Sequence, residues 1–278
     1  MTRHLDTIKQ IASDYDAIVL DQWGVLHDGT KPYGAAVEIL SELKAAGTRL
    51  AVLSNSGKRA TPNVERIAAM GFEPDLFEHV MTSGEALWAD IQEQRINETR
   101  FFAIERSEGD ARHWASGLDI ELIQSLPEAS AVLLMGLPDG STLPDWTGLL
   151  EDALNTQMPV YCSNPDRQSP RADGLVISPG ALGFAYRDMG GKTVFYGKPH
   201  EPIFRSLEKA LGTQNLLMVG DSLEHDVSGG QTAGWDTLFV RGGLYAEEFA
   251  QAGIDETLTR LCAAKSCTAP TYFIEVLK

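Results

Sequence analysis

The sequence has few cysteines and no long apolar run. Its three cysteines, Cys162, Cys262 and Cys267, lack the spacing typical of zinc sites, and an odd number makes a poor disulfide framework. We therefore expect reduced, partly buried thiols. No segment approaches the roughly 18 consecutive apolar residues of a membrane-spanning helix, and the first ten residues are polar, unlike a secretory signal. A cytoplasmic location is the expectation.

Basic residues are also scarce. The 23 Lys and Arg residues are outnumbered by 39 Asp and Glu residues, which gives a formal net charge of −16. A field of this sign repels nucleic acids and anionic membranes, so neither is an expected partner. An anionic substrate must therefore be held by a local site. Both a monomer and a homodimer are compatible with the sequence.

Short β-branched runs alternate with amphipathic stretches along the chain. This alternation is typical of a parallel sheet with helices on both faces, so we predict an α/β fold with a Rossmann-like, doubly wound core. Strands are expected at residues 17–20, 49–53, 193–196, 216–219, 237–240 and 272–276. Helices are expected at residues 34–46, 61–70, 201–211 and 247–252.

The middle of the chain has strands and helices of its own. Strands are expected at residues 100–104, 131–135 and 160–162, helices at 145–154 and 179–189, and a turn-rich segment at 162–174. These strands could extend the first sheet, but a separate inserted domain explains the pattern better. We therefore predict a core formed by residues 1–80 and 190–278, with a smaller α/β domain inserted at residues 81–189.

Four short polar segments follow expected strands, at the edge of an open α/β sheet where ligands bind. The four segments are Asp21-Gln22-Trp23-Gly24, Ser54-Asn55-Ser56, Gly197-Lys198-Pro199 and Gly220-Asp221-Ser222-Leu223-Glu224-His225-Asp226. Together they offer a carboxylate, a hydroxyl with turn amides, an ammonium group and a pair of carboxylates. Any one of them alone is more often a turn or a helix cap. All four in this order indicate a magnesium site that holds phosphate.

The order and spacing of these segments resemble the haloacid dehalogenase superfamily of hydrolases, which use an aspartate nucleophile. The insertion after the second segment resembles subclass IIA, the p-nitrophenyl phosphatases and the sugar- or nucleotide-phosphate phosphatases. Asn164-Pro165-Asp166, inside the insertion, is a further similarity. The resemblance covers nearly the whole chain. It implies that the insertion is a cap domain, that the substrate is a small phosphorylated metabolite and that the cofactor is Mg²⁺.

The resemblance also implies catalytic roles. Asp21 would attack phosphorus and form an aspartyl-phosphate, which divides one difficult step into two. Ser54 would donate a hydrogen bond to the transferring oxygens. Lys198 would offset their negative charge and keep Asp21 ionised.

The remaining implied roles concern the metal and the substrate. Mg²⁺ would be held by Asp21, Asp221 and Asp226 and by the backbone carbonyl of Trp23, which suits its preference for oxygen ligands. Ser54, Asn55, Ser56 and Lys198 would bind phosphate, and Asn164 and Asp166 would contact the substrate from the insertion.

Trp23 is the position at which this chain departs from the family. The family's phosphatases have an aspartate there, which protonates the leaving oxygen and then activates water, and an indole can do neither. General acid and base catalysis is worth about 10²–10⁴ in rate. Slow turnover is therefore expected unless the leaving group is good or another residue moves protons. His27 and Asp28 are the nearest substitutes, although exposed residues at the tip of a hairpin are the simpler interpretation of both.

The leading functional prediction is thus a Mg²⁺-dependent phosphatase with weakened proton transfer. The alternative from another class is a catalytically degenerate protein that uses the same pocket to bind a ligand or a partner. A dehalogenase or a phosphonate hydrolase is a minor alternative, because such relatives also lack an aspartate at the position of Trp23.

Overall fold

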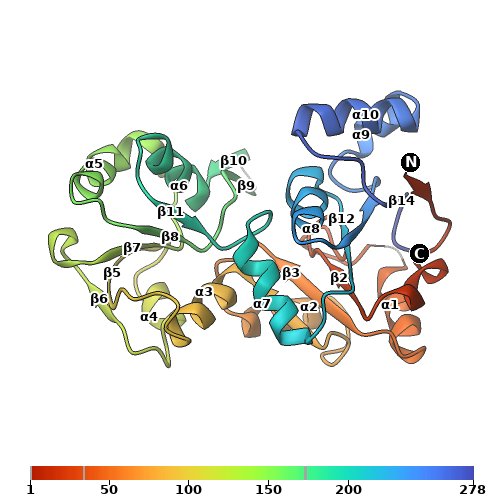
Figure 1. Ribbon diagram of the computed structural model, residues 1–278, viewed down its shortest axis with the longest axis horizontal. Coiled ribbons are helices and arrows are strands. Elements are labelled where there is room, and N and C mark those ends of the chain that lie inside the picture. The colour runs from red at the N-terminus through yellow and green to blue at the C-terminus, as the bar shows by residue number, and fades with distance from the viewer. Residues whose placement is uncertain (1, 34, 172–173) are drawn as a thin grey trace. The chain divides into compact units, whose positions relative to one another are not determined.

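The computed structural model describes residues 2–33, 35–171 and 174–278. The chain forms two compact units, each with its own sheet (Figure 1). The first unit comprises Met1–Ser54, Thr61–Met81 and Phe204–Lys278, and the second comprises Asn55–Ala60 and Thr82–Ile203. The chain therefore leaves the first unit and later returns to it.

In the described residues, the first unit has a seven-stranded sheet with the strand order β1-β14-β13-β12-β2-β3-β4. Its strands are β1 (Arg3–His4), β2 (Ala17–Leu20), β3 (Leu50–Ser54), β4 (His79–Thr82), β12 (Leu216–Gly220), β13 (Asp236–Val240) and β14 (Tyr272–Ile274). The central strands are parallel, and Ile18 of β2 lies opposite Leu217 of β12 and Leu50 of β3. Every residue of these three strands is buried, as expected for strands covered on both faces.

Helices cover both faces of this sheet. They are α1 (Ala36–Ala45), α2 (Ala60–Ala69), α7 (Glu201–Leu211), α8 (Ser228–Thr232), α9 (Ala246–Gln251) and α10 (Ile254–Lys265), with the short helices η1 (Ile8–Gln10), η2 (Ala12–Asp14) and the π-helix η5 (Leu223–Val227). Along β13, Leu238 and Val240 join the apolar cluster that contains α1, whereas Phe239 joins the cluster that contains α9 and α10. Successive strand residues point to opposite faces, so each face has its own core.

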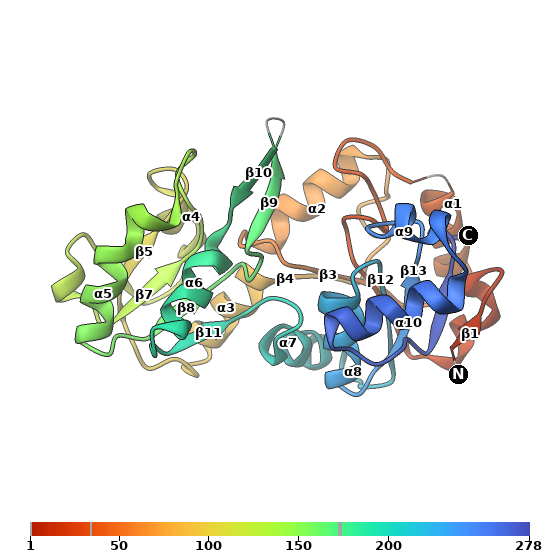
Figure 2. The ribbon, with the colours of Figure 1, turned by 90° about the horizontal axis from the view of Figure 1, so that it is seen from above.

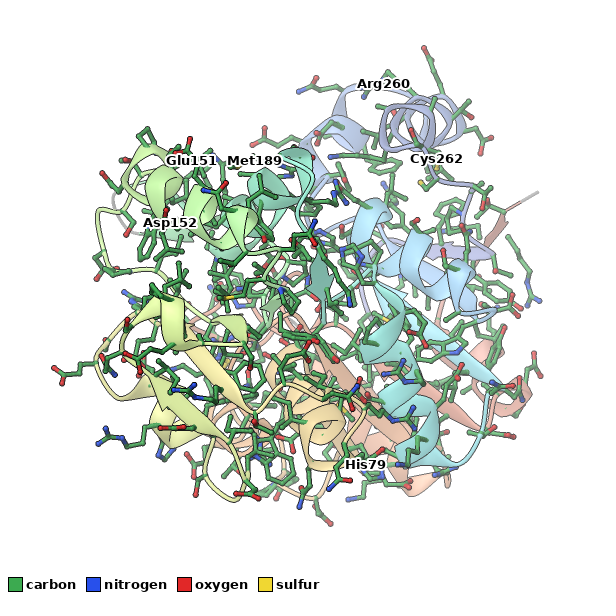
Figure 3. The ribbon with its side chains drawn as sticks, turned by 60° about the vertical axis from the view of Figure 1, so that its left-hand side comes forward. His79, Glu151, Asp152, Met189, Arg260 and Cys262 are labelled. Atoms are coloured by element: carbon green, nitrogen blue, oxygen red, sulfur yellow. The ribbon has the colours of Figure 1, made fainter. Side chains whose placement is uncertain are left out.

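The second unit has a five-stranded parallel sheet in its described residues, with the order β11-β8-β7-β5-β6. The strands are β5 (Arg100–Ile104), β6 (Glu121–Ile123), β7 (Ala131–Leu134), β8 (Val160–Cys162) and β11 (Thr193–Phe195); the helices are α3 (Ser83–Gln92), α4 (Asp110–Trp114), α5 (Thr147–Asn155), α6 (Pro179–Asp188), η3 (Leu126–Glu128) and η4 (Leu143–Trp146). On α5, Leu150 and Ala153 are buried, whereas Glu151 and Asp152 are exposed (Figure 3). Antiparallel β9 (Gln168–Arg171) and β10 (Gly174–Ile177) form a hairpin (Figure 2).

The predicted α/β class with doubly wound parallel sheets is confirmed, and four elements have the expected bounds: β2, β5, β8 and α7. The expected first residue of the 34–46 helix, Gly34, lies outside the described residues. The cysteines are free thiols, with Cys162 and Cys262 buried, which confirms that expectation. No helix of the described residues is long and apolar enough to cross a membrane.

One expectation about local structure was wrong. The strand at 193–196 was expected in the first sheet, but β11 pairs with β8 of the second sheet, because residues 193–195 align in register with 160–162. The turn-rich segment 162–174 also contains the strand β9, which pairs with β10. Several elements were not foreseen, among them the two-residue strand β1 and α10.

Candidate active site

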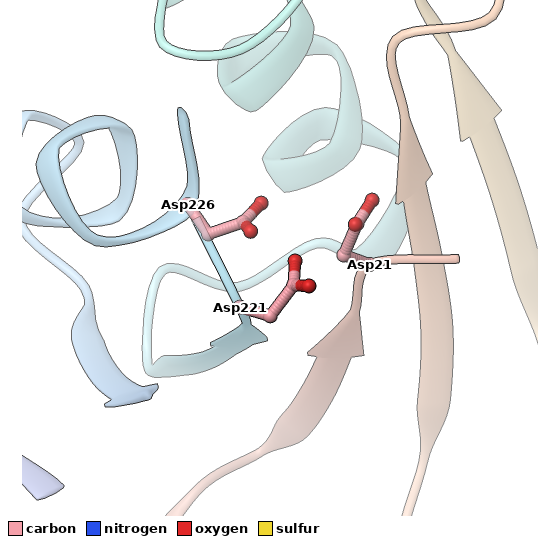
Figure 4. Close-up of side chains that lie close together, drawn as sticks. All are labelled: Asp21, Asp221 and Asp226. Atoms are coloured by element: carbon pink, nitrogen blue, oxygen red, sulfur yellow. The ribbon is translucent and has the colours of Figure 1, made fainter. Parts of the chain in front are cut away.

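Three aspartates converge at the carboxyl ends of two central strands. Asp21 follows β2, Asp221 follows β12, and Asp226 lies in η5. The strands are neighbours in register, and the backbone N–H of Asp21 donates to the carbonyl of Val219 over 2.9 Å. One carboxylate oxygen from each aspartate lies within 4.8 Å of the others (Figure 4). Parallel register therefore brings together carboxylates that are 200 residues apart in the chain.

Glycines make this close approach possible. A Cβ atom on Gly24, whose φ is +83°, would lie 1.7 Å from Oδ2 of Asp221. A Cβ on Gly243 would lie 2.3 Å from the same oxygen, and one on Gly220 would lie 2.2 Å from the Asp226 carboxylate. Any larger residue at these three positions would have to displace a carboxylate.

Backbone N–H groups orient the two buried carboxylates. The N–H of Leu244 donates to Oδ2 of Asp221 over 2.8 Å, and the N–H of Ser222 donates to Oδ2 of Asp226 over 3.0 Å. Asp221 is 7% exposed and Asp226 is 1% exposed. Burying several like charges together is costly unless positive charge compensates them. Three carboxylates with converging oxygens are a donor set that fits a hard divalent cation.

Trp23 lies on the turn that follows Asp21, and its side chain is 48% exposed. Its ring packs against the backbone of Gly29, where a Cβ would lie 2.3 Å from Cη2 of the indole. It also makes an edge contact with His27, with ring centroids 5.8 Å apart. The residue that departs from the family pattern is thus held in place by its own turn.

His27 was expected at an exposed hairpin tip, and this expectation was wrong. The side chain is fully buried, its Nδ1 accepts a hydrogen bond from the N–H of Gly29 over 3.0 Å, and its Nε2 lies 3.3 Å from the guanidinium of Arg66. Burial, aided by the charge of Arg66, lowers the pKa of His27 to about 4. His27 is therefore neutral at pH 7 and a poor replacement for the missing acid.

Asp28 behaves as a turn residue, as the sequence suggested. Its carboxylate accepts hydrogen bonds from the hydroxyl and N–H of Thr30 and from the N–H of Lys31. The bonds from Thr30 lower the pKa of Asp28 to about 2. A group that is ionised this strongly does not donate a proton near pH 7.

Ser54 is the last residue of β3 and is 7% exposed. Because β3 lies beside β2, with Val52 opposite Leu20, Ser54 ends its strand at the same edge as Asp21. This is the position expected for a hydroxyl that donates to the transferring oxygens. That role stays a prediction.

Most of the other predicted site residues meet in the second unit. Asn55 donates through Nδ2 to Oδ1 of Asp166 over 2.8 Å and accepts at Oδ1 from the backbone N–H of Lys198 over 2.7 Å. The N–H of Asp166 donates to Oδ1 of Asn164 over 2.9 Å. Lys198 is 2% exposed. These contacts join the polar segments Ser54-Asn55-Ser56 and Gly197-Lys198-Pro199 to the Asn164-Pro165-Asp166 segment. Whether these side chains and that of Ser56 bind phosphate stays a prediction.

Sequence reasoning missed two residues that shape the Asp221 site. Gly243 and Leu244 lie in the loop after β13 and approach the Asp221 carboxylate. The available signal was the glycine pair Gly242-Gly243 shortly after a strand, because glycines at such positions often allow close approach of the backbone.

Two family models match this chain. Residues 18–117 match a model described as haloacid dehalogenase-like hydrolase, and residues 195–264 match a second, HAD-hydrolase-like model. A D-glycerol 3-phosphate phosphatase of Mycobacterium tuberculosis is 26% identical over 240 residues, which cover 85% of this chain and 66% of the relative. A 5′-nucleotidase of Bacillus subtilis is 27% identical, covering 84% of this chain and 90% of the relative.

Solved structures show the same fold. A haloacid dehalogenase-like hydrolase from Brucella suis has a TM-score of 0.79 at 28% identity, covering 99% of this chain and 100% of that one. A glycerol phosphate phosphatase from Mycobacterium tuberculosis, solved in complex with magnesium, has a TM-score of 0.70 at 23% identity, covering 88% of this chain and 74% of that one. The same glycerol phosphate phosphatase has also been solved in complex with calcium.

Proposed function

Because this chain belongs to the haloacid dehalogenase-like hydrolases and its curated relatives include phosphatases, we propose that it is a Mg²⁺-dependent phosphatase for a small phosphorylated metabolite. The observation that carries the proposal is the convergence of the Asp21, Asp221 and Asp226 carboxylates. Such a cluster meets two needs of phosphoryl transfer, a nucleophile and a cation site, at one sheet edge.

In the proposed reaction, a carboxylate oxygen of Asp21 attacks phosphorus. The ester P–O bond breaks and its electron pair stays on the leaving oxygen. Water then cleaves the aspartyl-phosphate, which releases phosphate and restores Asp21. Ser54 and Lys198 bind the transferring oxygens. The three aspartates and the carbonyl of Trp23 would hold Mg²⁺, whose positive charge would offset the charge of the phosphate.

Trp23 makes the leaving group decisive. An indole holds no transferable proton at neutral pH, and neither His27, with a pKa of about 4, nor the strongly ionised Asp28 supplies one. The leaving oxygen therefore departs unprotonated or takes a proton from water. Esters with poor leaving groups therefore lose up to the 10²–10⁴ in rate that acid catalysis typically provides, whereas esters whose leaving groups are stable as anions lose little.

Trp23 also favours a second candidate function, the binding of a ligand without catalysis. A family member that binds a phosphorylated ligand without hydrolysing it would need the aspartate cluster but not the acid, which is the combination found here. Turnover separates the two proposals, because both require a bound cation. Dehalogenase and phosphonate hydrolase activities remain minor candidates, which halide release and cleavage of a carbon–phosphorus bond would detect.

The test is a panel of phosphate esters with good and poor leaving groups, assayed with Mg²⁺. We expect wild type to hydrolyse the good ones, Asp21→Asn to be inactive, and the control Asp28→Asn to resemble wild type. Trp23→Asp should raise rates on poor leaving groups more than on good ones. If wild type hydrolyses none of the esters faster than Asp21→Asn does, the protein is not a phosphatase and the ligand-binding proposal takes its place.

Further parts of this proposal come from the sequence. They are a cytoplasmic location, a monomer or homodimer, and a cap domain at residues 81–189 in which Asn164 and Asp166 contact the substrate. Asn55 and Ser56 are proposed to bind phosphate beside Ser54. The hydrogen bonds among Asn55, Asp166 and Lys198 support a shared role for these motifs.

A further inference from the structure

Two cysteines are held together at the carboxyl-terminal end of α10. The helix ends at Lys265, and Ser266 follows it in the left-handed conformation, with a φ of +54°. The N–H of Cys267 donates to the carbonyl of Cys262 over 3.1 Å. The N–H of Ser266 donates to the carbonyl of Ala263 over 3.3 Å. These two hydrogen bonds form a Schellman motif, in which the chain folds back over the last turn of the helix.

The Schellman motif explains why the two side chains meet. In this motif, the residue after the left-handed position commonly packs an apolar side chain against the residue five positions earlier. Here Cys267 and Cys262 occupy these positions, and both side chains belong to the apolar cluster that contains Phe239 of β13. Two cysteines that are joined by a backbone hydrogen bond and packed together need only a small movement to reach the geometry of a disulfide.

The two thiols differ in exposure and in acidity. Cys262 is buried and Cys267 is half-buried, whereas Arg260 of the same helix is exposed (Figure 3). Burial, aided by the neighbouring sulfur of Cys267, raises the pKa of Cys262 to about 12. Burial also raises the pKa of Cys267, but a hydrogen bond from the Cys262 thiol offsets part of this effect. The thiolate therefore forms more readily at Cys267, which is also the more accessible of the two.

The third cysteine is in a different environment and provides an internal reference. Cys162 lies in β8 of the second unit, is 0% exposed and donates its thiol hydrogen to the carbonyl of Asn164 over 3.1 Å. Burial raises its pKa to about 12. A reagent that needs an accessible thiolate should therefore leave Cys162 unmodified in the folded protein.

We propose that Cys262 and Cys267 are a site of reversible oxidation, at which a low-molecular-weight disulfide such as glutathione disulfide converts the two thiols into an intramolecular disulfide. The Cys267 thiolate attacks one sulfur of glutathione disulfide, whose S–S bond breaks and releases one glutathione thiolate. The Cys262 thiol loses its proton to the solvent, and its sulfur displaces the second glutathione from Cys267. The protein thus loses two hydrogens, and one glutathione disulfide is reduced to two glutathione molecules.

This site does not depend on the proposed phosphatase function. In a reducing compartment, a disulfide of this kind is typically transient and responds to the redox state of the surroundings. Its closure joins the ends of a loop of six residues, from Cys262 to Cys267, and so reduces the conformational freedom of the unfolded chain. Because the Schellman motif already holds the two residues together, we expect oxidation to raise the midpoint of thermal unfolding by a few degrees.

The experiment treats the full chain with glutathione disulfide, alkylates the remaining thiols after denaturation, and measures the masses of the intact protein and of its peptides. We expect a protein that lacks two hydrogens, with the disulfide mapped to Cys262 and Cys267 and with Cys162 alkylated. Dithiothreitol should restore the reduced mass. The inference is overturned if wild type stays reduced, stops at a glutathione adduct, or forms disulfides between molecules. A lower midpoint of thermal unfolding after oxidation would show that the bond strains the turn, and would also overturn it.

Single variants separate the roles of the two thiols. Cys262→Ser should stop at a stable glutathione adduct on Cys267, because the thiol that displaces glutathione is missing. Cys267→Ser should react at Cys262 at least about 10-fold more slowly than Cys262→Ser reacts at Cys267, because the remaining thiol is buried and less acidic. The matched control Cys162→Ala should form the disulfide at the wild-type rate. Equal reaction rates in the two serine variants would contradict the assignment of Cys267 as the attacking thiol.

Discussion

Replacing Gly24 by alanine tests how the cation site is built. Gly24 combines a φ of +83° with a position at which a Cβ would lie 1.7 Å from Oδ2 of Asp221. The conformation alone costs an alanine about 1–2 kcal/mol. The steric overlap adds a displacement of the Asp221 carboxylate, so Gly24→Ala should weaken the binding of Mg²⁺ as well as the fold.

Gly47→Ala is the matched control. Gly47 follows α1 in the same unit with a φ of +92°, and a Cβ there would have nothing within 4 Å. Both variants therefore bear a similar conformational cost, and only Gly24→Ala disturbs the cation site. The difference between the two variants isolates the steric effect on Asp221.

The magnitude follows from ligand linkage. At a Mg²⁺ concentration 100 times the dissociation constant, the ion stabilises wild type by about 2.7 kcal/mol. If the displaced carboxylate weakens binding about 100-fold, as the loss of a well-oriented ligand shell can do, about 0.4 kcal/mol of that stabilisation remains. Urea unfolding with and without Mg²⁺ measures both quantities, and calorimetric titration measures affinity directly. A Gly24→Ala protein that binds Mg²⁺ as tightly as Gly47→Ala would refute the reasoning.

Two further predictions concern charge. The pKa of His27 is lowered to about 4 in the folded state, so between about pH 6.5 and pH 4 the unfolded chain binds the extra proton and stability falls as the pH falls. Over this pH window, His27→Gln should lose less stability than wild type, by an amount on the order of 3 kcal/mol. Urea unfolding at several pH values measures the free energy of unfolding of both proteins. If the two free energies fall in parallel with pH, the burial of a neutral His27 is contradicted. The net charge of −16 predicts no tight binding of nucleic acid at physiological salt, and a nanomolar gel shift with DNA or RNA would contradict it.

The sequence by itself located much of the fold. The bounds of β2, β5, β8 and α7 agree with the expected ranges because continuous apolar runs and helical periodicity are local properties of the chain. The convergence of Asp21, Asp221 and Asp226 was also foreseen, since polar residues after parallel strands meet at one edge of a sheet.

The tertiary structure decided what depends on contacts between distant residues. Pairing with β8 placed β11 in the second sheet, and packing near Arg66 buried His27 and lowered its pKa. The loop after β13 brought the N–H of Leu244 to the Asp221 carboxylate, which the Gly242-Gly243 pair signals only as a possible close approach. Local sequence does not determine these contacts, because register, burial and close approach are set by partners that lie far away in the sequence.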